Sequence, residues 1–192
     1  MTREQFLEEC CYLKTLSLSA SKKIGVPLFY VDKADEIRLS EDIFNNNEVT
    51  QRAITIIGDM SLAHGHGVTH ARKVAIDAGA IVIAELSHIE ENELFKMVDY
   101  AHFAGVFHDI ARKKNNHAHI GAQEAERLLI MLGIDSAGVF AIKNAIANHE
   151  AFQKQITRMQ EYEQLLSDAL YDADKLTPDV NNGHEKFMLH PF

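Results

Sequence analysis

The chain has 192 residues, of which 46% are hydrophobic, and a formal net charge of -9. This length is sufficient for one sizeable core, so we expect a single domain over residues 1–192. Phosphate backbones are held mainly by Lys and Arg, so the acidic excess argues against nucleic acid as a partner. The two cysteines, Cys10 and Cys11, are adjacent and therefore poor partners for each other, which predicts a reducing, cytoplasmic environment.

Neither a membrane span nor a secretory leader is expected. The first nine residues (MTREQFLEE) carry carboxylates where a secretory signal would be apolar. No stretch reaches the ~18 apolar residues that a transmembrane helix needs. We therefore expect a cytoplasmic protein with no membrane partner.

The periodicity of apolar residues predicts an all-α fold. Apolar residues recur at intervals of three and four over most of the chain, which contains only three prolines. We expect a first helix over residues 7–18 and another over 48–63, whereas 28–48 is ambiguous, with 35–39 interpreted as a short turn of helix. Five further helices are expected, at about residues 68–86, 94–112, 118–132, 136–149 and 159–173.

Four polar side chains lie on or beside the apolar stripes of these helices: His70, His108, Asp109 and Asp174. An unpaired imidazole or carboxylate is costly to bury, and a shared divalent ion would remove that cost. Nitrogen and oxygen ligands without sulfur suit Mn, Fe, Co, Ni or Zn, and the sequence does not choose among them. The alternative is that the two histidines are ordinary hydrogen-bonded core residues.

Adjacent residues of a helix point about 100° apart, so His108 and Asp109 would not normally share an ion. They can share one beside the last turn of a helix. The basic run at residues 112–114 complements the negative end of a helix, so we expect this helix to stop near residues 112–116.

The same residues lie in segments that resemble the HD superfamily of metal-dependent phosphohydrolases. The resemblance covers about residues 60–177 and leaves 1–59 as a helical amino-terminal extension and 178–192 as a tail. It implies an HD-domain helical bundle in which the four residues named above bind the metal. The segments that match its opening, central and closing motifs are residues 66–74 (HGVTHARKV), 106–112 (VFHDIAR) and 172–176 (DADKL).

The resemblance also implies roles for two more histidines: His117 and His149 match positions that hold a second ion or face the substrate phosphate in relatives. His66 lies four residues before His70, on the same face if the helix begins that early, where it would line the cleft. The spacing from Asp109 to His117 is shorter than in binuclear members, so we expect one ion and leave a second open. The alternatives are a satisfied core histidine for His149 and solvated positions for His117 and His66.

The function implied by this resemblance is hydrolysis of a phosphate ester or anhydride in a small phosphorylated molecule, a nucleotide in particular, by a metal-bound water. Asp109 would also accept the proton of the water, and Arg112 or Lys113 would contact the substrate phosphate. One alternative is a nucleotide- or metabolite-sensing domain with little turnover. Another is oxidative chemistry at a di-iron centre built with His117 and His149. A homodimer formed through the first helices also remains open.

Overall fold

The regular structure of the chain is entirely helical where it is described. The computed structural model describes residues 12, 27–61, 67–150 and 161–176, and these contain eight α-helices and no strand. This confirms the all-α prediction. None of the described helices combines the length and apolar character that crossing a bilayer requires.

The chain divides into two compact units, residues 33–177 and a smaller unit of residues 1–32 with 178–192. The described helix of the smaller unit is α2 (Leu28–Asp32). The expected helix at 7–18 lies outside the described residues apart from Tyr12, as do His66 and the tail from residue 178. The assignment of one domain therefore stays a prediction.

The larger unit contains all the other described helices, and α4 to α9 confirm the six helices expected after residue 48. Their bounds are α3 (Ala34–Asn46), α4 (Glu48–Ser61), α5 (Val68–Glu85), α6 (Glu91–Phe107), α7 (His117–Leu132), α8 (Ser136–Asn148) and α9 (Glu161–Leu176).

Helix α3 has 13 residues, so the short turn expected at 35–39 was too short. The face of α3 that packs inward carries Ser40 as well as Phe44, and both side chains are buried. The hydroxyl of Ser40 donates a hydrogen bond to the carbonyl oxygen of Ile76 on α5, at 2.7 Å. A buried serine therefore interrupts the apolar pattern that would have identified this helix.

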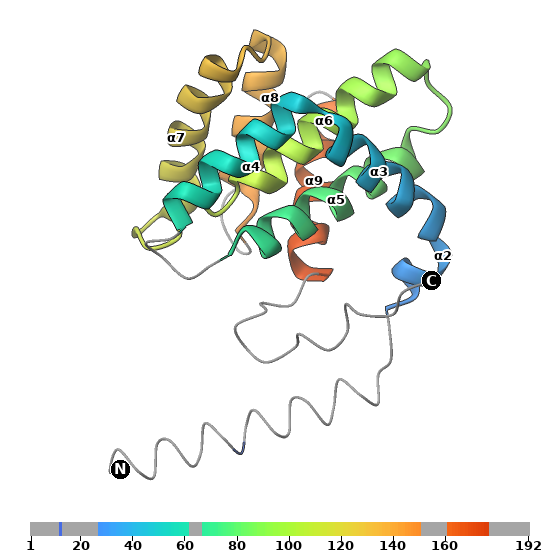
Figure 1. Cartoon of the computed structure of the whole chain (residues 1–192), viewed down its shortest axis with the longest axis horizontal. Coiled ribbons are helices and arrows are strands. Elements are labelled where there is room, and N and C mark those ends of the chain that lie inside the picture. The colour runs from blue at the N-terminus through green and yellow to red at the C-terminus, as the bar shows by residue number, and fades with distance from the viewer. Residues whose placement is uncertain (1–11, 13–26, 62–66, 151–160, 177–192) are drawn as a thin grey trace. The chain divides into compact units, whose positions relative to one another are not determined.

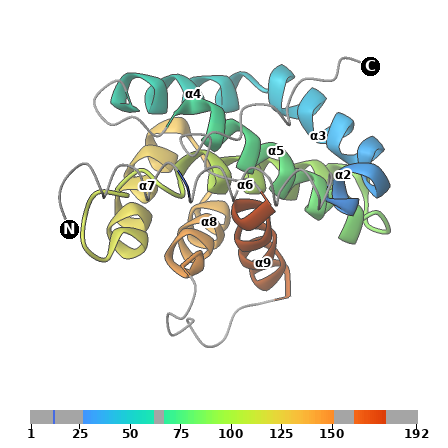
Figure 2. The same cartoon turned by 90° about the horizontal axis from the view of Figure 1, so that it is seen from below.

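Helices α5 and α6 form the centre of the larger unit (Figure 1). Figure 2 shows α3 and α4 on one side of this pair and α8 and α9 on the other, with α7 beside α8. A Cβ atom built on Gly105 of α6 would lie well under 3.0 Å from the backbone of Ala75 on α5. Glycine at position 105 therefore lets the two central helices approach closely, which brings the start of α5 near the end of α6.

Candidate metal centre

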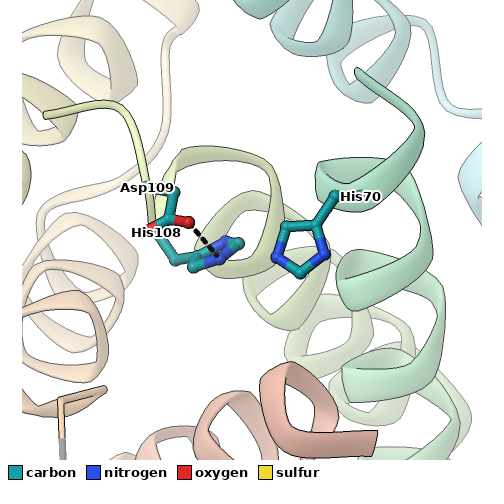
Figure 3. A group of neighbouring side chains, drawn as sticks. All are labelled: His70, His108 and Asp109. Carbon is teal, nitrogen blue, oxygen red and sulfur yellow. Dashed lines mark ion pairs between the residues drawn. The ribbon is translucent and has the colours of Figure 1, made fainter. Parts of the chain in front are cut away.

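The predicted metal ligands lie at the ends of different helices. His70 is the third residue of α5, His108 and Asp109 directly follow α6, and Asp174 lies in the last turn of α9. Figure 3 shows the imidazole of His70 facing that of His108, with the ring of His108 paired to Asp109. Residues separated by about 100 positions in the sequence are thus adjacent in the fold.

Four of the predicted ligands make up what we call the first cluster: His70, His108, Asp109 and Asp174. The Oδ1 atom of Asp174 lies 3.4 Å from Nε2 of His70 and 3.6 Å from Nε2 of His108. Nε2 of His108 is also 3.4 Å from Oδ2 of Asp109. His70, His108 and Asp109 offer ligand atoms within 4.8 Å of one another, so this buried group could hold a metal ion.

The hydrogen bonding of the buried imidazoles tests whether a metal fits. Both ring nitrogens of His70 and Nε2 of His108 are buried without a hydrogen-bond partner, and the two residues are only 6% and 1% exposed. An unsatisfied buried polar atom costs about 1–3 kcal/mol, so three of them in one place require an explanation. A shared ion would explain these unpartnered nitrogens. His70 is therefore not an ordinary hydrogen-bonded core histidine.

The end of α6 explains how adjacent residues can both face this cluster. The helix ends at Phe107, earlier than the expected 112–116, and the chain continues in turns such as that from the carbonyl of Phe107 to the amide of Ile110. Nδ1 of His108 lies 2.8 Å from the carbonyl oxygen of Gly105. The imidazole thus satisfies one of the carbonyl groups left without a partner at a helix end, and Asp109 no longer follows helical geometry.

A second cluster shares Asp109 with the first and adds His117 and His149. Oδ1 of Asp109 lies 3.8 Å from Nε2 of His117 and 3.7 Å from Nε2 of His149. These three residues form another group with the geometry to hold a metal ion. The turns over 110–116 return the chain to the site, so the short spacing that led us to expect one ion does not keep His117 out of reach.

Hydrogen bonds on Nδ1 fix the tautomers of three of these histidines. His149 follows the end of α8 and repeats the arrangement of His108, with Nδ1 2.6 Å from the carbonyl oxygen of Ile146. A carbonyl oxygen only accepts, so each Nδ1 carries the hydrogen and Nε2 of the neutral ring is the lone-pair nitrogen. In His117, Nδ1 is paired with Glu150. All three Nε2 atoms face Asp109.

The electrostatics of the first cluster are those of a site prepared for a cation. Burial by itself would lower the pKa of His108, but the carboxylates of Asp109 and Asp174 raise this pKa to about 10. Burial opposes ionisation of these two carboxyls as well, yet the adjacent imidazole of His108 and other neighbouring side chains hold their pKa values well below the usual range. The carboxylates are therefore ionised at neutral pH, and positive charge between them is favoured.

The cations near the site differ from those expected. Arg112 forms an ion pair with Asp109, so it lies at the edge of both clusters. Lys113 is exposed, and its side chain forms no ion pair or hydrogen bond with residues that the structure describes. Lys175 was not expected to take part, but its Nζ lies 2.6 Å from Oδ2 of Asp174. Its position directly after Asp174 was the available signal in the sequence.

The sequence patterns also did not point to Glu150. Its Oε1 atom lies 2.6 Å from Nδ1 of His117. Glu150 directly follows His149, and a charged residue at the end of a helix is indistinguishable from a surface residue by pattern alone.

Comparison with known proteins does not identify a family. No family model matches the chain, and no curated protein or solved structure is significantly similar to it. What the structure itself shows, over the described residues, is an all-helical protein with buried clusters of histidine and aspartate that could hold metal.

Proposed function

We propose that this chain is a metal-dependent phosphohydrolase of the HD type, which hydrolyses an ester or anhydride bond in a small phosphorylated metabolite, a nucleotide in particular. The observation that carries the proposal is the pair of clusters that share Asp109, with histidine Nε2 atoms directed at both of its oxygens. The order of the sequence motifs containing His70, His108 and Asp174 supports the same assignment.

The donor atoms favour particular metals. The two clusters offer imidazole nitrogens and carboxylate oxygens without sulfur, which suits Mn, Fe, Co, Ni or Zn. The ends of α6, α8 and α9 contribute partial negative charge near the same place, which also favours a cation. We propose one ion in the first cluster and a second in the cluster of Asp109, His117 and His149.

A bound divalent ion would supply Lewis acidity toward a phosphoryl oxygen and lower the pKa of water from 15.7 toward about 7. The protein contributes positioning and charge. Asp109 lies between the two clusters, where its carboxylate can accept a proton from the attacking water. Among the described residues, Arg112 pairs with Asp109 and Lys175 with Asp174, and these two cations would stabilise the negative charge that develops on phosphorus.

The experiment that tests this function combines elemental analysis of the purified protein with a panel of nucleotides and other phosphorylated metabolites. Each substrate is assayed for phosphate release with added Mn, Co, Ni or Mg. We expect sustained release that depends on the metal. Tight binding of a nucleotide without release would instead favour the sensing alternative. One ion per chain would count against a di-iron oxidative centre and also against the second ion proposed above.

The Asp109→Ala variant provides the decisive comparison. Because Asp109 belongs to both clusters, its loss should remove bound metal and turnover together. Asp42→Ala, which removes an exposed carboxylate on α3, is the matched control and should retain both. An Asp109→Ala protein with full metal-dependent phosphatase activity would show that the assignment is wrong.

A further inference from the structure

Glu150 occupies a position that the proposed reaction does not use. It directly follows His149, and its side chain is 19% exposed. Its Oε1 atom lies 2.6 Å from Nδ1 of His117, a distance typical of a charge-assisted hydrogen bond. The carboxylate can only accept, so the hydrogen resides on Nδ1 of His117.

His117 consequently lies between two carboxylates that contact opposite nitrogens of its ring. Nδ1 meets Glu150, and Nε2 lies 3.8 Å from Oδ1 of Asp109. With Nδ1 protonated, Nε2 of the neutral ring presents its lone pair on the side of Asp109 and His149. The imidazole is therefore held in the tautomer and direction required of a ligand.

The other two histidines directed at Asp109 are oriented by the backbone. Nδ1 of His108 bonds to Gly105 and Nδ1 of His149 to Ile146, each through a carbonyl at the end of its own helix. His117 is the first residue of α7 and has no such carbonyl before it within the helix. The acceptor that orients the ring of His117 must therefore be a side chain from another element, whereas backbone carbonyls orient His108 and His149.

We propose that Glu150 is a positioning residue, which orients His117 so that its Nε2 completes the binding site for a second divalent ion with Asp109 and His149. This inference rests on the proposed metal site but not on the proposed hydrolysis. Glu150 is not itself a ligand in this arrangement, because it belongs to neither of the residue groups with metal-binding geometry. Its effect on the ion is transmitted through the imidazole of His117.

The test is a Co²⁺ titration of the metal-free full chain. Binding is monitored by calorimetry and by the visible absorption of bound cobalt. We expect two binding steps in the unsubstituted protein. In Glu150→Ala the first step should be unchanged, and the second should weaken about 10- to 100-fold, the usual effect of removing a carboxylate that orients a histidine ligand. Glu126→Ala is the matched control, because Glu126 lies on α7 with His117 but pairs with Lys143.

The Glu150→Gln variant separates positioning from a structural role. The amide oxygen of glutamine can accept the same hydrogen bond, so this variant should recover most of the second step. A residue needed only for folding would weaken both steps equally. Its replacement would also lower the thermal stability of the metal-free protein.

Two outcomes would overturn the inference: a second step that is unchanged in Glu150→Ala, or binding of a single Co²⁺ ion by the unsubstituted protein. Weakening of the second step alone, without phosphate release from any substrate in the panel, would support the role of Glu150. That same result would contradict the proposed hydrolysis, so the two failures are distinguishable.

Discussion

Two buried histidines, one within helix α6 and one directly after it, have pKa values that are shifted in opposite directions. His102 lies within the helix and His108 directly follows it, and both are at most 1% exposed. Burial lowers the pKa of His102 to about 3, whereas the neighbouring carboxylates overcome burial and raise that of His108 to about 10. Burial of a histidine therefore does not identify a functional site, and the charges packed around the ring decide what it can do.

The surroundings of His102 explain its behaviour. The hydroxyl of Ser40 donates its hydrogen to the carbonyl of Ile76, so it accepts one from Nε2 of His102, 3.0 Å away. Nδ1 of His102 is buried without a hydrogen-bond partner, and the ring packs edge-on against Phe44. His102 is a neutral residue that joins α3 to the central helices.

The largest expected effect comes from two glycines, Gly105 and Gly79, at close contacts of the central helices. A Cβ at position 105 would collide with the backbone of Ala75, which cannot move without separating α5 from α6. We expect Gly105→Ala to reduce the free energy of unfolding by about 3 kcal/mol, measured by urea denaturation. In Gly79→Ala the atoms nearest to the Cβ would belong to the side chains of Ser40 and His102, which can shift more readily than a backbone, so the loss should be smaller. Equal losses would contradict this account of the helix contact.

The next prediction concerns the carboxylate between His70 and His108. Asp174→Asn retains the shape of the side chain but removes the charge that both imidazoles face. The affinity of the first cluster for Co²⁺ should fall more than about 100-fold, beyond the usual effect of removing a group that only orients a ligand. Asp172→Asn removes an exposed carboxylate from the same helix and should bind Co²⁺ normally. Unchanged affinity in Asp174→Asn would exclude Asp174 as a ligand.

A third prediction uses the lowered pKa of His102. Its ordinary pKa is 6.5, so below that pH the unfolded chain takes up a proton that the folded chain, with a pKa of about 3, does not. The stabilisation is complete above pH 6.5 and is lost as pH falls toward 3, and it amounts to about 2 kcal/mol between pH 7 and pH 5.

The variant that checks this contribution is His102→Gln, because its amide can still donate to Ser40 but does not titrate. Denaturation curves at pH 7 and pH 5 should show a smaller loss of stability in the variant than in the unsubstituted protein. The same pH dependence in both proteins would mean that His102 is protonated in the folded state.

The last prediction concerns His108, where a proton and a metal ion compete for Nε2. Because the pKa of His108 in the metal-free protein is about 10, the ion must displace a proton at neutral pH. Affinity should therefore rise about tenfold per pH unit from pH 7 to 9. Calorimetry in buffers of different ionisation enthalpy measures the released proton directly. His102→Gln should release the same number, and no release from either protein would contradict the prediction.

The sequence predicted those parts of the molecule that depend on periodic apolar residues. Helices α4 to α9 follow from intervals of three and four, and His108 was placed on an inward-facing row and His70 beside one. Helix α3 was underestimated because Ser40 takes a buried position that would ordinarily be apolar. The early end of α6 was missed because the apolar pattern does not signal the contact there between the side chain of His108 and a backbone carbonyl.

The geometry of the second cluster could not be read from the sequence for a related reason. Its formation depends on the turns over residues 110–116, where Asn116 adopts a left-handed conformation with φ of 60° directly before His117. Asparagine tolerates this conformation better than most residues, but its occurrence at one position is not predictable from composition. The contact between Glu150 and His117 likewise joins residues that no helical interval relates.

The distribution of the first cluster along the chain has a consequence for how the protein resists unfolding. An ion coordinated by His70 and Asp174 would act as a removable cross-link that closes a loop of about 100 residues. Binding to the folded form alone adds RT ln(1 + [L]/Kd) to its stability. Chelation would then do more than stop a reaction: it would loosen the ends of α5, α6 and α9 together and expose them to proteases.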